Sequence, residues 1–285
     1  MNENSIYDVS IVCANYNNGK YLNEFLESVL NSSSQPKELI IVDDGSTDDS
    51  LKILKGYNLD FLKIISLKEN VGFANALNIG VEHASCKYIL RVDPDDLLGK
   101  DRIRTQCDFL DRNKNIDITG SNAIYFRDNI NTVVGSSNFP IEEIDIINRY
   151  KKGEHGLLHG TVTGKTSLFK ENRYYQSNVP AEDYDIFSRM IAMGAKPKSI
   201  SENLTYVRIH KNSISNSLPY NTIKLTYQLR DGIFHTNTSK IVILINYLSI
   251  KFYRKYYYEQ APLKKFCFLG ISAFFRPDKA IRKLF

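Results

Sequence analysis

Two groups of carboxylates each follow a short apolar segment in the first hundred residues of the chain. One of them, Asp93-Pro94-Asp95-Asp96, comes directly after residues 88–92, YILRV. Three carboxylates in four residues repel one another, and a divalent cation among them relieves the repulsion. Mg²⁺ or Mn²⁺ held by one or two carboxylates, and otherwise by phosphates and water, is the usual arrangement at a nucleotide site. The same residues also suit a helix N-terminus, so this group alone leaves both interpretations open.

The second group spans residues 43–48, DDGSTD, after the apolar residues 39–42. Asp-Gly and Ser-Thr-Asp are ordinary turn and cap signals, so one interpretation is a turn between a strand and a helix. In the other interpretation the carboxylate at the strand end binds a base N–H or a ribose hydroxyl. Gly45 would then permit the close approach, and Tyr16 would offer a ring on which the base could stack.

Glycine-rich phosphate loops are absent from the expected places. A dinucleotide site needs GxGxxG after the first strand, and residues 15–19 do not supply it. Residues 160–166, GTVTGKT, resemble the end of a P-loop, but only three residues separate the two glycines. The sequence therefore favours a nucleotide site built from carboxylates and a metal ion.

The elements that would position these residues alternate between strand and helix. Short segments rich in β-branched residues predict strands, and apolar residues at three- and four-residue spacing predict helices. The predicted strands are residues 9–14, 39–42, 61–65 and 88–92, and the helices that follow them are residues 21–30, 48–54, 73–83 and 102–110. Four such units predict an α/β fold with a mostly parallel sheet covered on both faces. In such a sheet the ligand lies beyond the carboxyl ends of the strands, where both carboxylate groups fall.

The pattern loosens after residue 117. We expect a strand near residues 118–125, a loop near Gly135, helices near 141–150 and 182–193, a strand at 204–209, and only helices from about residue 218. At 285 residues the chain is long for one domain and short for two. We therefore expect a catalytic domain over residues 1–216, with a nucleotide-sugar half of about 1–115 and an acceptor half of about 116–216. A helical extension would follow over residues 217–285.

Charge is distributed unevenly along the chain. The net charge is +5, yet residues 240–285 carry ten Lys or Arg against Glu259 and Asp278, which leaves residues 1–239 at −3. A nucleic-acid-binding protein would spread its basic residues over the folded domain, so we expect no nucleic-acid partner. A basic, aromatic tail suits peripheral contact with an anionic membrane surface, with residues 251–258 as the contact helix or, alternatively, as a solvated helix.

Location in the cell is indicated by what the sequence lacks. The four cysteines have no CxxC spacing, and the N-terminus has neither the charged start nor the apolar core of a signal peptide, which predicts a cytoplasmic protein. The longest uncharged segments, residues 241–250 and 266–275, are about half as long as a membrane-spanning helix. We therefore expect contact with the inner face of the cell membrane and no span across it.

Several segments, in this order, resemble the family 2 glycosyltransferases with the GT-A fold. They are VSIVCANYN (9–17), ELIIVDDGSTDDS (38–50), ENVGFANALNIG (69–80), YILRVDPDD (88–96), Arg102 with Gln106, HGT (159–161), AEDYD (181–185), and LTYVRIH (204–210) with Ser213 and Ser215. The resemblance covers roughly residues 8–216. ALNIG and RVDPDD are similar to the branch that builds capsules, exopolysaccharides and O-antigens. Two positions depart from the family: many relatives carry Pro or Thr in place of Ala14, and some carry Arg in place of Leu77, which argues against a phosphate role for that helix.

The resemblance implies a role for each matching residue. Asp183 would be the catalytic base, Tyr16 would stack on uracil, and Asp44, or otherwise Asp43, would bind the base. Asp93 and Asp95 would meet the diphosphate through Mn²⁺ or Mg²⁺, with His210 as a further metal ligand. Arg208 and His210 resemble the late Arg-x-His that closes over the diphosphate. The donor-binding set is Ala14, Tyr16, Asp43, Asp44, Asn70, Asn75, Arg91, Asp93, Asp95, Arg208 and His210, and the acceptor side holds His159 and Glu182. The alternatives are a helix cap for Asp183, a strand-end histidine for His210 and a structural role for His159.

The sequence thus predicts an inverting, metal-dependent glycosyltransferase. The leaving nucleoside diphosphate gathers negative charge, which a divalent metal and Arg208 would stabilise. Asp183 would accept the proton of the attacking hydroxyl. The expected donor is a UDP-sugar carrying a hexose or N-acetylhexosamine, and the expected acceptor is a lipid-linked oligosaccharide in surface polysaccharide biosynthesis. One alternative is a sugar-nucleotide nucleotidyltransferase, although residues 15–19 lack the Gly-rich basic loop of that class. The other is an inactive nucleotide-binding scaffold.

Overall fold

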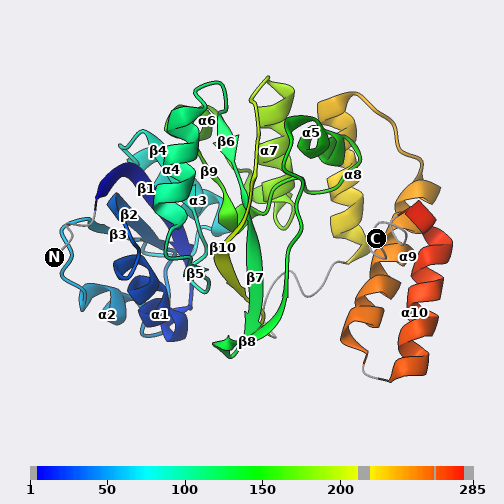
Figure 1. The fold of residues 1–285 in the computed structure, drawn as a ribbon, viewed down its shortest axis with the longest axis horizontal. Helices are drawn as coiled ribbons and strands as arrows, with labels where there is room; N and C mark the ends of the chain where they lie inside the picture. The colour runs from blue at the N-terminus through cyan, green and yellow to red at the C-terminus, as the bar shows by residue number, and fades with distance from the viewer. Residues whose placement is uncertain (1–4, 211–218, 260, 279–285) are drawn as a thin grey trace. The chain divides into compact units, whose positions relative to one another are not determined.

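The computed structural model describes residues 5–210, 219–259 and 261–278, in two compact units that divide between Ser213 and Ile214 (Figure 1). The boundary that the sequence predicts, between residues 216 and 217, lies outside the described residues, as do Ser213 and Ser215 of the last motif. The first unit holds two sheets with helices around them, and the second unit is helical.

The larger sheet has six strands in the order β3-β2-β1-β4-β9-β6. Its parallel strands are β1 (Ile6–Asn15), β2 (Gln35–Asp43), β3 (Leu62–Ser66) and β4 (Tyr88–Arg91). Residues 9–15 of β1 and all of β4 are buried, as expected for parallel strands that are covered on both faces. The predicted α/β fold with a mostly parallel sheet is confirmed.

The predicted helices of the first half are α1 (Gly19–Leu30), α2 (Ser50–Lys55), α3 (Phe73–His83) and α4 (Arg102–Arg112). α1 forms because Leu22, Phe25 and Val29 recur at helical spacing and are buried in the same cluster as Ile11 of β1. α3 covers the opposite face, where Val12 points. A Cβ at Gly80 would lie 2.6 Å from Cγ1 of Val12, so glycine lets α3 lie close to the sheet.

Two features of the first unit were not expected from the sequence. β9 (Thr163–Lys165) extends the larger sheet antiparallel to β4 and also pairs with β6 (Ile118–Thr119), which begins the strand segment predicted near residues 118–125. The prediction of a loop near Gly135 is wrong, because β8 (Asn129–Ser136) is a strand that pairs with β7 (Ser121–Arg127). No residue of β8 is buried, so its sequence lacks the alternation of apolar and polar positions that marks a strand.

The smaller sheet has the order β5-β10-β7-β8 and includes β5 (Leu97–Leu98) and β10 (Ile200–Arg208). β5 follows residues 93–96 directly and pairs with β10, so it brings the end of β10 to this carboxylate group. The remaining elements of the unit are α5 (Glu143–Lys151), α6 (Thr166–Glu171), α7 (Glu182–Ala192) and the 3-10 turns His159–Thr161 and Gln176–Asn178.

The described part of the second unit consists of α8 (Tyr220–Phe234), α9 (Lys240–Tyr258) and α10 (Pro262–Phe275). Ile223 and Tyr227 of α8 pack against Ile243 of α9. The helices expected in this region are confirmed. None of the described helices has the length and apolar content needed to cross a bilayer.

Candidate active site

The carboxyl ends of β1 and β2 bring the first predicted residues together. Asn15 ends β1 and lies opposite Asp43, which ends β2. Nδ2 of Asn15 donates to Oδ2 of Asp43 over 2.7 Å, and the backbone N–H of Ser46 donates to Oδ1 over 3.1 Å. Asp43 is fully buried, so its position is fixed by the protein before any ligand binds.

Asp44 positions the loop that leads into α3. Its two carboxylate oxygens accept the backbone N–H groups of Val71, over 2.7 Å, and Gly72, over 3.0 Å. Gly45 lies against the same loop with a φ of 70°, and a Cβ there would lie 2.7 Å from the backbone carbon of Glu69. Only glycine fits at this position. A contact of Asp44 with a base stays a prediction. Each carboxylate oxygen accepts one backbone N–H and has a second lone pair, which a base N–H could use.

The other predicted base-side residues differ in exposure. Tyr16 is 47% exposed, which leaves a face of its ring accessible to a stacking partner. Asn70 and Asn75 are also exposed, and Nδ2 of Asn75 donates to the carbonyl of Val71 over 2.9 Å. Ala14 is buried within β1.

Arg91 ends β4 and holds Asp93 in place. Its buried guanidinium lies over the ring of Phe73 and donates from Nη2 to Oδ1 of Asp93 over 2.5 Å. Burial raises the pKa of the Asp93 carboxyl, but the charge and hydrogen bond of Arg91, together with His159 and Arg102, outweigh burial, and the pKa lies below its ordinary value. Arg91 therefore keeps Asp93 ionised and oriented.

The carboxyl groups of Asp95 and Asp96 have pKa values above the ordinary value, in contrast to Asp93. Burial and the charge of Asp93 raise the pKa of Asp95, and burial and Asp95 raise the pKa of Asp96 well above its ordinary value. Oδ2 of Asp95 lies 2.9 Å from Nε2 of His210, which is 115 residues later in the sequence. Oδ1 of Asp96 accepts the backbone N–H of Arg208 over 2.8 Å. The structure thus brings the predicted pair Asp95 and His210 together, and Asp96 anchors the end of β10 beside them.

Arg208 is enclosed by protein groups, with 3% of its side chain exposed. Nε donates to the carbonyl of Asp95 over 3.0 Å, Nη1 to the carbonyl of Asp128 over 2.9 Å, and Nη2 to Oε2 of Glu24 over 2.7 Å. It therefore joins α1, the residue 93–96 segment and the turn between β7 and β8. Contact with a diphosphate stays a prediction, and it would require the guanidinium to exchange a protein partner for a phosphate oxygen.

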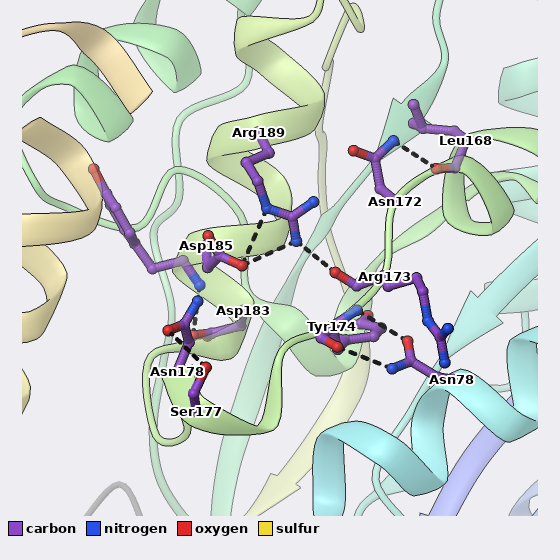
Figure 2. A network of polar contacts seen from close by, with 11 residues as sticks. Asn78, Leu168, Asn172, Arg173, Tyr174, Ser177, Asn178, Asp183, Asp185 and Arg189 are labelled. Atoms are coloured by element: carbon purple, nitrogen blue, oxygen red, sulfur yellow. Dashed lines mark hydrogen bonds and ion pairs between the residues drawn. The ribbon is translucent and has the colours of Figure 1, made fainter. Parts of the chain in front are cut away.

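Asp183 lies in the first turn of α7, where the sequence places it (Figure 2). Oδ1 accepts the backbone N–H of Tyr184 over 2.7 Å, and Oδ2 lies 3.4 Å from Nδ1 of His155. His155 is not among the residues predicted from the sequence. It stands in the loop between α5 and the His159–Thr161 turn, and no spacing in the sequence marks it.

Glu182 is buried beside Asp183, and among the described residues its Oε2 has no hydrogen-bond partner. Burial and the charge of Asp183 raise the pKa of Glu182 to about 8. The carboxyl therefore keeps its proton near neutral pH. An unsatisfied buried polar atom therefore lies next to the predicted base.

Glu182→Gln is expected to change how stability depends on pH. This carboxyl titrates near its ordinary pKa of 4.5 when unfolded and near about 8 in the fold, so between these values only the folded state keeps the proton. Wild-type stability therefore falls as the pH rises from 4.5 through about 8. We expect the variant's Tm to equal that of the wild type at pH 4 and to exceed it by roughly 5–10 °C at pH 9.

Thermal unfolding at both pH values measures this difference. The control is Glu143→Gln, which removes a carboxylate from the first turn of α5. Equal Tm values for the wild type and Glu182→Gln at pH 9 would show that the folded protein does not raise the pKa of Glu182.

His159 is fixed among aromatic rings. Its Nε2 lies 3.1 Å from the hydroxyl of Tyr174, and its ring packs edge-on against Phe73 and Phe187. Burial and the charge of Arg91 lower the pKa of His159 to about 4. His159 is therefore a neutral hydrogen-bonding group at physiological pH.

Buried polar contacts hold the turn that carries His159. Nη1 of Arg102 donates to the carbonyl of Gly160 over 2.9 Å, and Nε2 of Gln106 donates to the carbonyl of Thr161 over 2.8 Å. Burial lowers the pKa of Arg102 to about 9. The predicted pair Arg102 and Gln106 therefore positions this part of the site from α4.

The segment that carries Tyr174 is held from both sides (Figure 2). The backbone N–H of Tyr174 donates to Oδ1 of Asn78, and Nδ2 of Asn78 donates to the carbonyl of Tyr174, each over 2.9 Å. Nη2 of Arg189 donates to Oδ2 of Asp185 over 2.9 Å and to the carbonyl of Arg173 over 2.5 Å. α3 and α7 thus fix Tyr174, and through it His159.

Electrostatic contacts join the two halves of the site. Burial raises the pKa of Tyr174, and the charge of Arg91 opposes this rise. The same pKa is raised further by Glu182 and Asp183 on α7 and by Asp93 after β4. Asp93 and the start of α7 therefore both influence the charge of one tyrosine. Ring contacts link the same parts of the chain, because Arg91 lies over Phe73, Phe73 packs against His159, and His159 packs against Phe187 of α7.

The described residues that could hold a divalent cation form a pair. No three His, Cys, Asp or Glu side chains among them are grouped as a metal site would need. Asp95 and His210 nevertheless offer an oxygen and a nitrogen 2.9 Å apart, with the ionised Asp93 nearby. A cation would relieve the repulsion between Asp93 and Asp95. This donor set fits Mg²⁺ or Mn²⁺ that takes its other ligands from a diphosphate and water.

The sequence of this chain matches one family model and several individual proteins. Residues 10–173 match the family model described as Glycosyl transferase family 2. EpsE of Bacillus subtilis (strain 168) is 33% identical over 212 residues, covering 72% of this chain and 74% of EpsE. The amylovoran biosynthesis glycosyltransferase AmsE of Erwinia amylovora is 25% identical over 224 residues, covering 77% of this chain and 83% of AmsE.

Solved structures share the fold. TarS of S. aureus in complex with UDP-GlcNAc matches with a TM-score of 0.64 at 19% identity, covering 95% of this chain and 82% of that chain. The mannosyltransferase PcManGT of Pyrobaculum calidifontis in complex with GDP-Man and Mn²⁺ matches with a TM-score of 0.55 at 16% identity. The match covers 94% of this chain and 69% of PcManGT. The predicted GT-A fold is confirmed.

Proposed function

The chain belongs to glycosyl transferase family 2, and from this premise we propose that it transfers a hexose or an N-acetylhexosamine from a UDP-sugar to a hydroxyl of an oligosaccharide, with inversion. One observation supports the proposal: Arg91, which holds Asp93 beyond β4, is linked through the rings of Phe73 and His159 to α7, whose first turn carries Asp183. Such a site can bind a donor diphosphate on one side and deprotonate an acceptor on the other.

Asp183 acts as the general base. As the acceptor oxygen forms its bond to the anomeric carbon, the bond from that carbon to the diphosphate oxygen breaks and its electron pair leaves with the nucleoside diphosphate. The acceptor's proton passes to the Asp183 carboxylate. Attack on the face opposite the leaving group inverts the configuration. His155, 3.4 Å from Oδ2, orients the carboxylate.

The donor lies along the strand ends. Tyr16 stacks on the base, and Asp43 or Asp44 binds it, with Ala14, Asn70 and Asn75 around the base and ribose. Asp95, His210 and Asp93 hold Mn²⁺ or Mg²⁺, which when bound stabilises negative charge on the leaving diphosphate. Arg91 orients Asp93, and Arg208 places a second positive charge beside the site.

Glu182 and His159 form the acceptor side. The protonated Glu182 can donate a hydrogen bond to an acceptor oxygen, and neutral His159 can accept or donate one. The name of AmsE supports a role in surface polysaccharide biosynthesis, such as a capsule, an exopolysaccharide or an O-antigen. The acceptor is then lipid-linked, and the enzyme works at the cytoplasmic face of the membrane with its second unit in contact with the lipid.

A panel of UDP-, GDP- and TDP-sugars, each with Mn²⁺, Mg²⁺ or EDTA, tests the proposal. We expect slow release of UDP from one UDP-sugar without acceptor, faster release with acceptor, and little release in EDTA. Formation of pyrophosphate from a nucleoside triphosphate and a sugar phosphate would identify a nucleotidyltransferase instead. Nucleotide binding without turnover would identify a scaffold, and an absence of nucleoside diphosphate binding in calorimetry with either metal would contradict both.

A further inference from the structure

The contact between α9 and α10 is polar at its centre. Ser249 and Ser272 are buried where the two helices meet. Oγ of Ser249 donates to the carbonyl of Ser272 over 3.1 Å, and Oγ of Ser272 donates to the carbonyl of Ser249 over 2.8 Å. Phe252 packs beside them against Phe268 and Phe275. Small hydroxyl residues let the two helices approach closely and link them by hydrogen bonds.

The exposed side of α10 is apolar along its length. Its members are Leu263, Phe266, Cys267, Gly270, Ile271 and Phe274, which we call the apolar face of α10. Each of these positions is three or four residues from another member of the set, so they lie on one side of the helix. Leu263 and Phe274 are 82% exposed and Phe266 is 73% exposed. The first turns of α9 add the exposed Ile241, Val242 and Leu244. An exposed apolar helix face of this kind marks a contact with another phase or partner.

The positive charge of the second unit indicates what binds the apolar face of α10. Residues 240–278 carry seven Lys or Arg against Glu259 and Asp278, a net charge of +5. Among the cations, Lys251, Lys255 and Lys264 are exposed. A second copy of this chain fits poorly, because a symmetric contact would bring two such basic surfaces together. Anionic lipid supplies both an apolar interior and negative headgroups.

We propose that the α9–α10 hairpin inserts the apolar face of α10 into the interfacial layer of an anionic bilayer, while the lysines contact lipid phosphates. A helix of this type lies parallel to the membrane with its apolar side about 5–10 Å deep. The exposed Phe266 and Phe274 on the outside of the hairpin, with the contact between Ser249 and Ser272 buried inside it, suit this environment. The inference rests on the membrane contact proposed above and is independent of the donor sugar.

Cys267 provides a reporter within the apolar face. It is exposed, whereas Cys13, Cys86 and Cys107 are buried. Burial raises the thiol pKa of these three to about 12, about 11 and about 12, so a maleimide dye should label Cys267 of the folded full chain selectively. We expect the dye's emission to shift to shorter wavelength with phosphatidylglycerol-containing vesicles and to stay unchanged with phosphatidylcholine alone. No shift with either vesicle, or a Cys267 that resists labelling, would overturn the proposal.

Flotation with the same vesicles tests the side chains themselves. In the double variant Phe266→Glu and Phe274→Glu we expect the bound fraction to fall roughly tenfold or more. Ile144→Glu is the matched control, because Ile144 is 62% exposed on a helix of the first unit, and it should float like the wild type. Equal flotation of the double variant would overturn the proposal, as would a wild-type dimer in light scattering that the double variant converts to monomer. UDP release is recorded separately, so a failure of sugar transfer and a failure of membrane binding are different results.

Discussion

Asp183→Asn is expected to lower kcat for sugar transfer by roughly 10²–10⁴-fold while leaving donor binding nearly unchanged. Asparagine has the size of aspartate, and its oxygen can still accept the backbone N–H of Tyr184, which Oδ1 of Asp183 accepts now. The amide cannot take a proton from the acceptor hydroxyl. Steady-state UDP release with acceptor measures kcat, and calorimetry with UDP and Mn²⁺ measures donor-side binding.

Asp145→Asn serves as the control for this variant. Asp145 also lies in the first turn of a helix, α5, so its loss reports the effect of removing an acid beside a helix N-terminus. We expect that control to keep wild-type kcat. If Asp183→Asn retained more than about a tenth of wild-type kcat, another group would be the base.

Asp95→Ala should weaken donor binding and the metal dependence of turnover together. Oδ2 of Asp95 forms the close pair with Nε2 of His210, and its removal leaves His210 without the carboxylate partner. We expect kcat/KM to fall by roughly a hundredfold or more, because charge on the leaving diphosphate is no longer stabilised. UDP binding measured with Mn²⁺ should weaken, whereas binding in EDTA should match that of the wild type.

The matched control is Asp101→Ala, a few residues along the same segment. Asp101 precedes α4 and pairs with Arg104 over 2.7 Å at the surface. This variant should keep both metal dependence and donor affinity. An Asp95→Ala protein with wild-type UDP affinity in Mn²⁺ would assign the carboxylate group a structural role at the β5 turn.

The parallel half of the fold could be predicted because strands that are buried on both faces appear in the sequence as uninterrupted apolar segments. β1 and β2 contain short runs of β-branched residues, β4 is a short and mostly apolar segment, and α1 repeats its apolar residues at helical spacing. β8 and β9 show no such pattern, since β8 is largely exposed and β9 has three residues. Strand pairing there is decided by distant segments, which a local pattern does not contain.

Some residues of the candidate site could likewise be predicted from the sequence, and others could not. Asp93, Asp95 and Asp183 stand at strand or helix ends, so their position in the chain indicates their place in the fold. His155 lies in an irregular loop and reaches Asp183 only through the packing of α5 and α7. The shifted pKa of Glu182 likewise arises from burial, which the sequence does not disclose.

The contacts that bring Asp95 and His210 together join residues far apart in the chain. Asp96 and Arg208 are 112 residues apart, and Asp95 and His210 are 115 apart. Contacts of such long sequence separation form late in folding, because a large loop must close first. A nascent chain on the ribosome can therefore pair β1, β2 and β4 before β10 has emerged from the exit tunnel. Until then Asp95 lacks the contact with His210, so the proposed metal site is complete only after β10 has been synthesised.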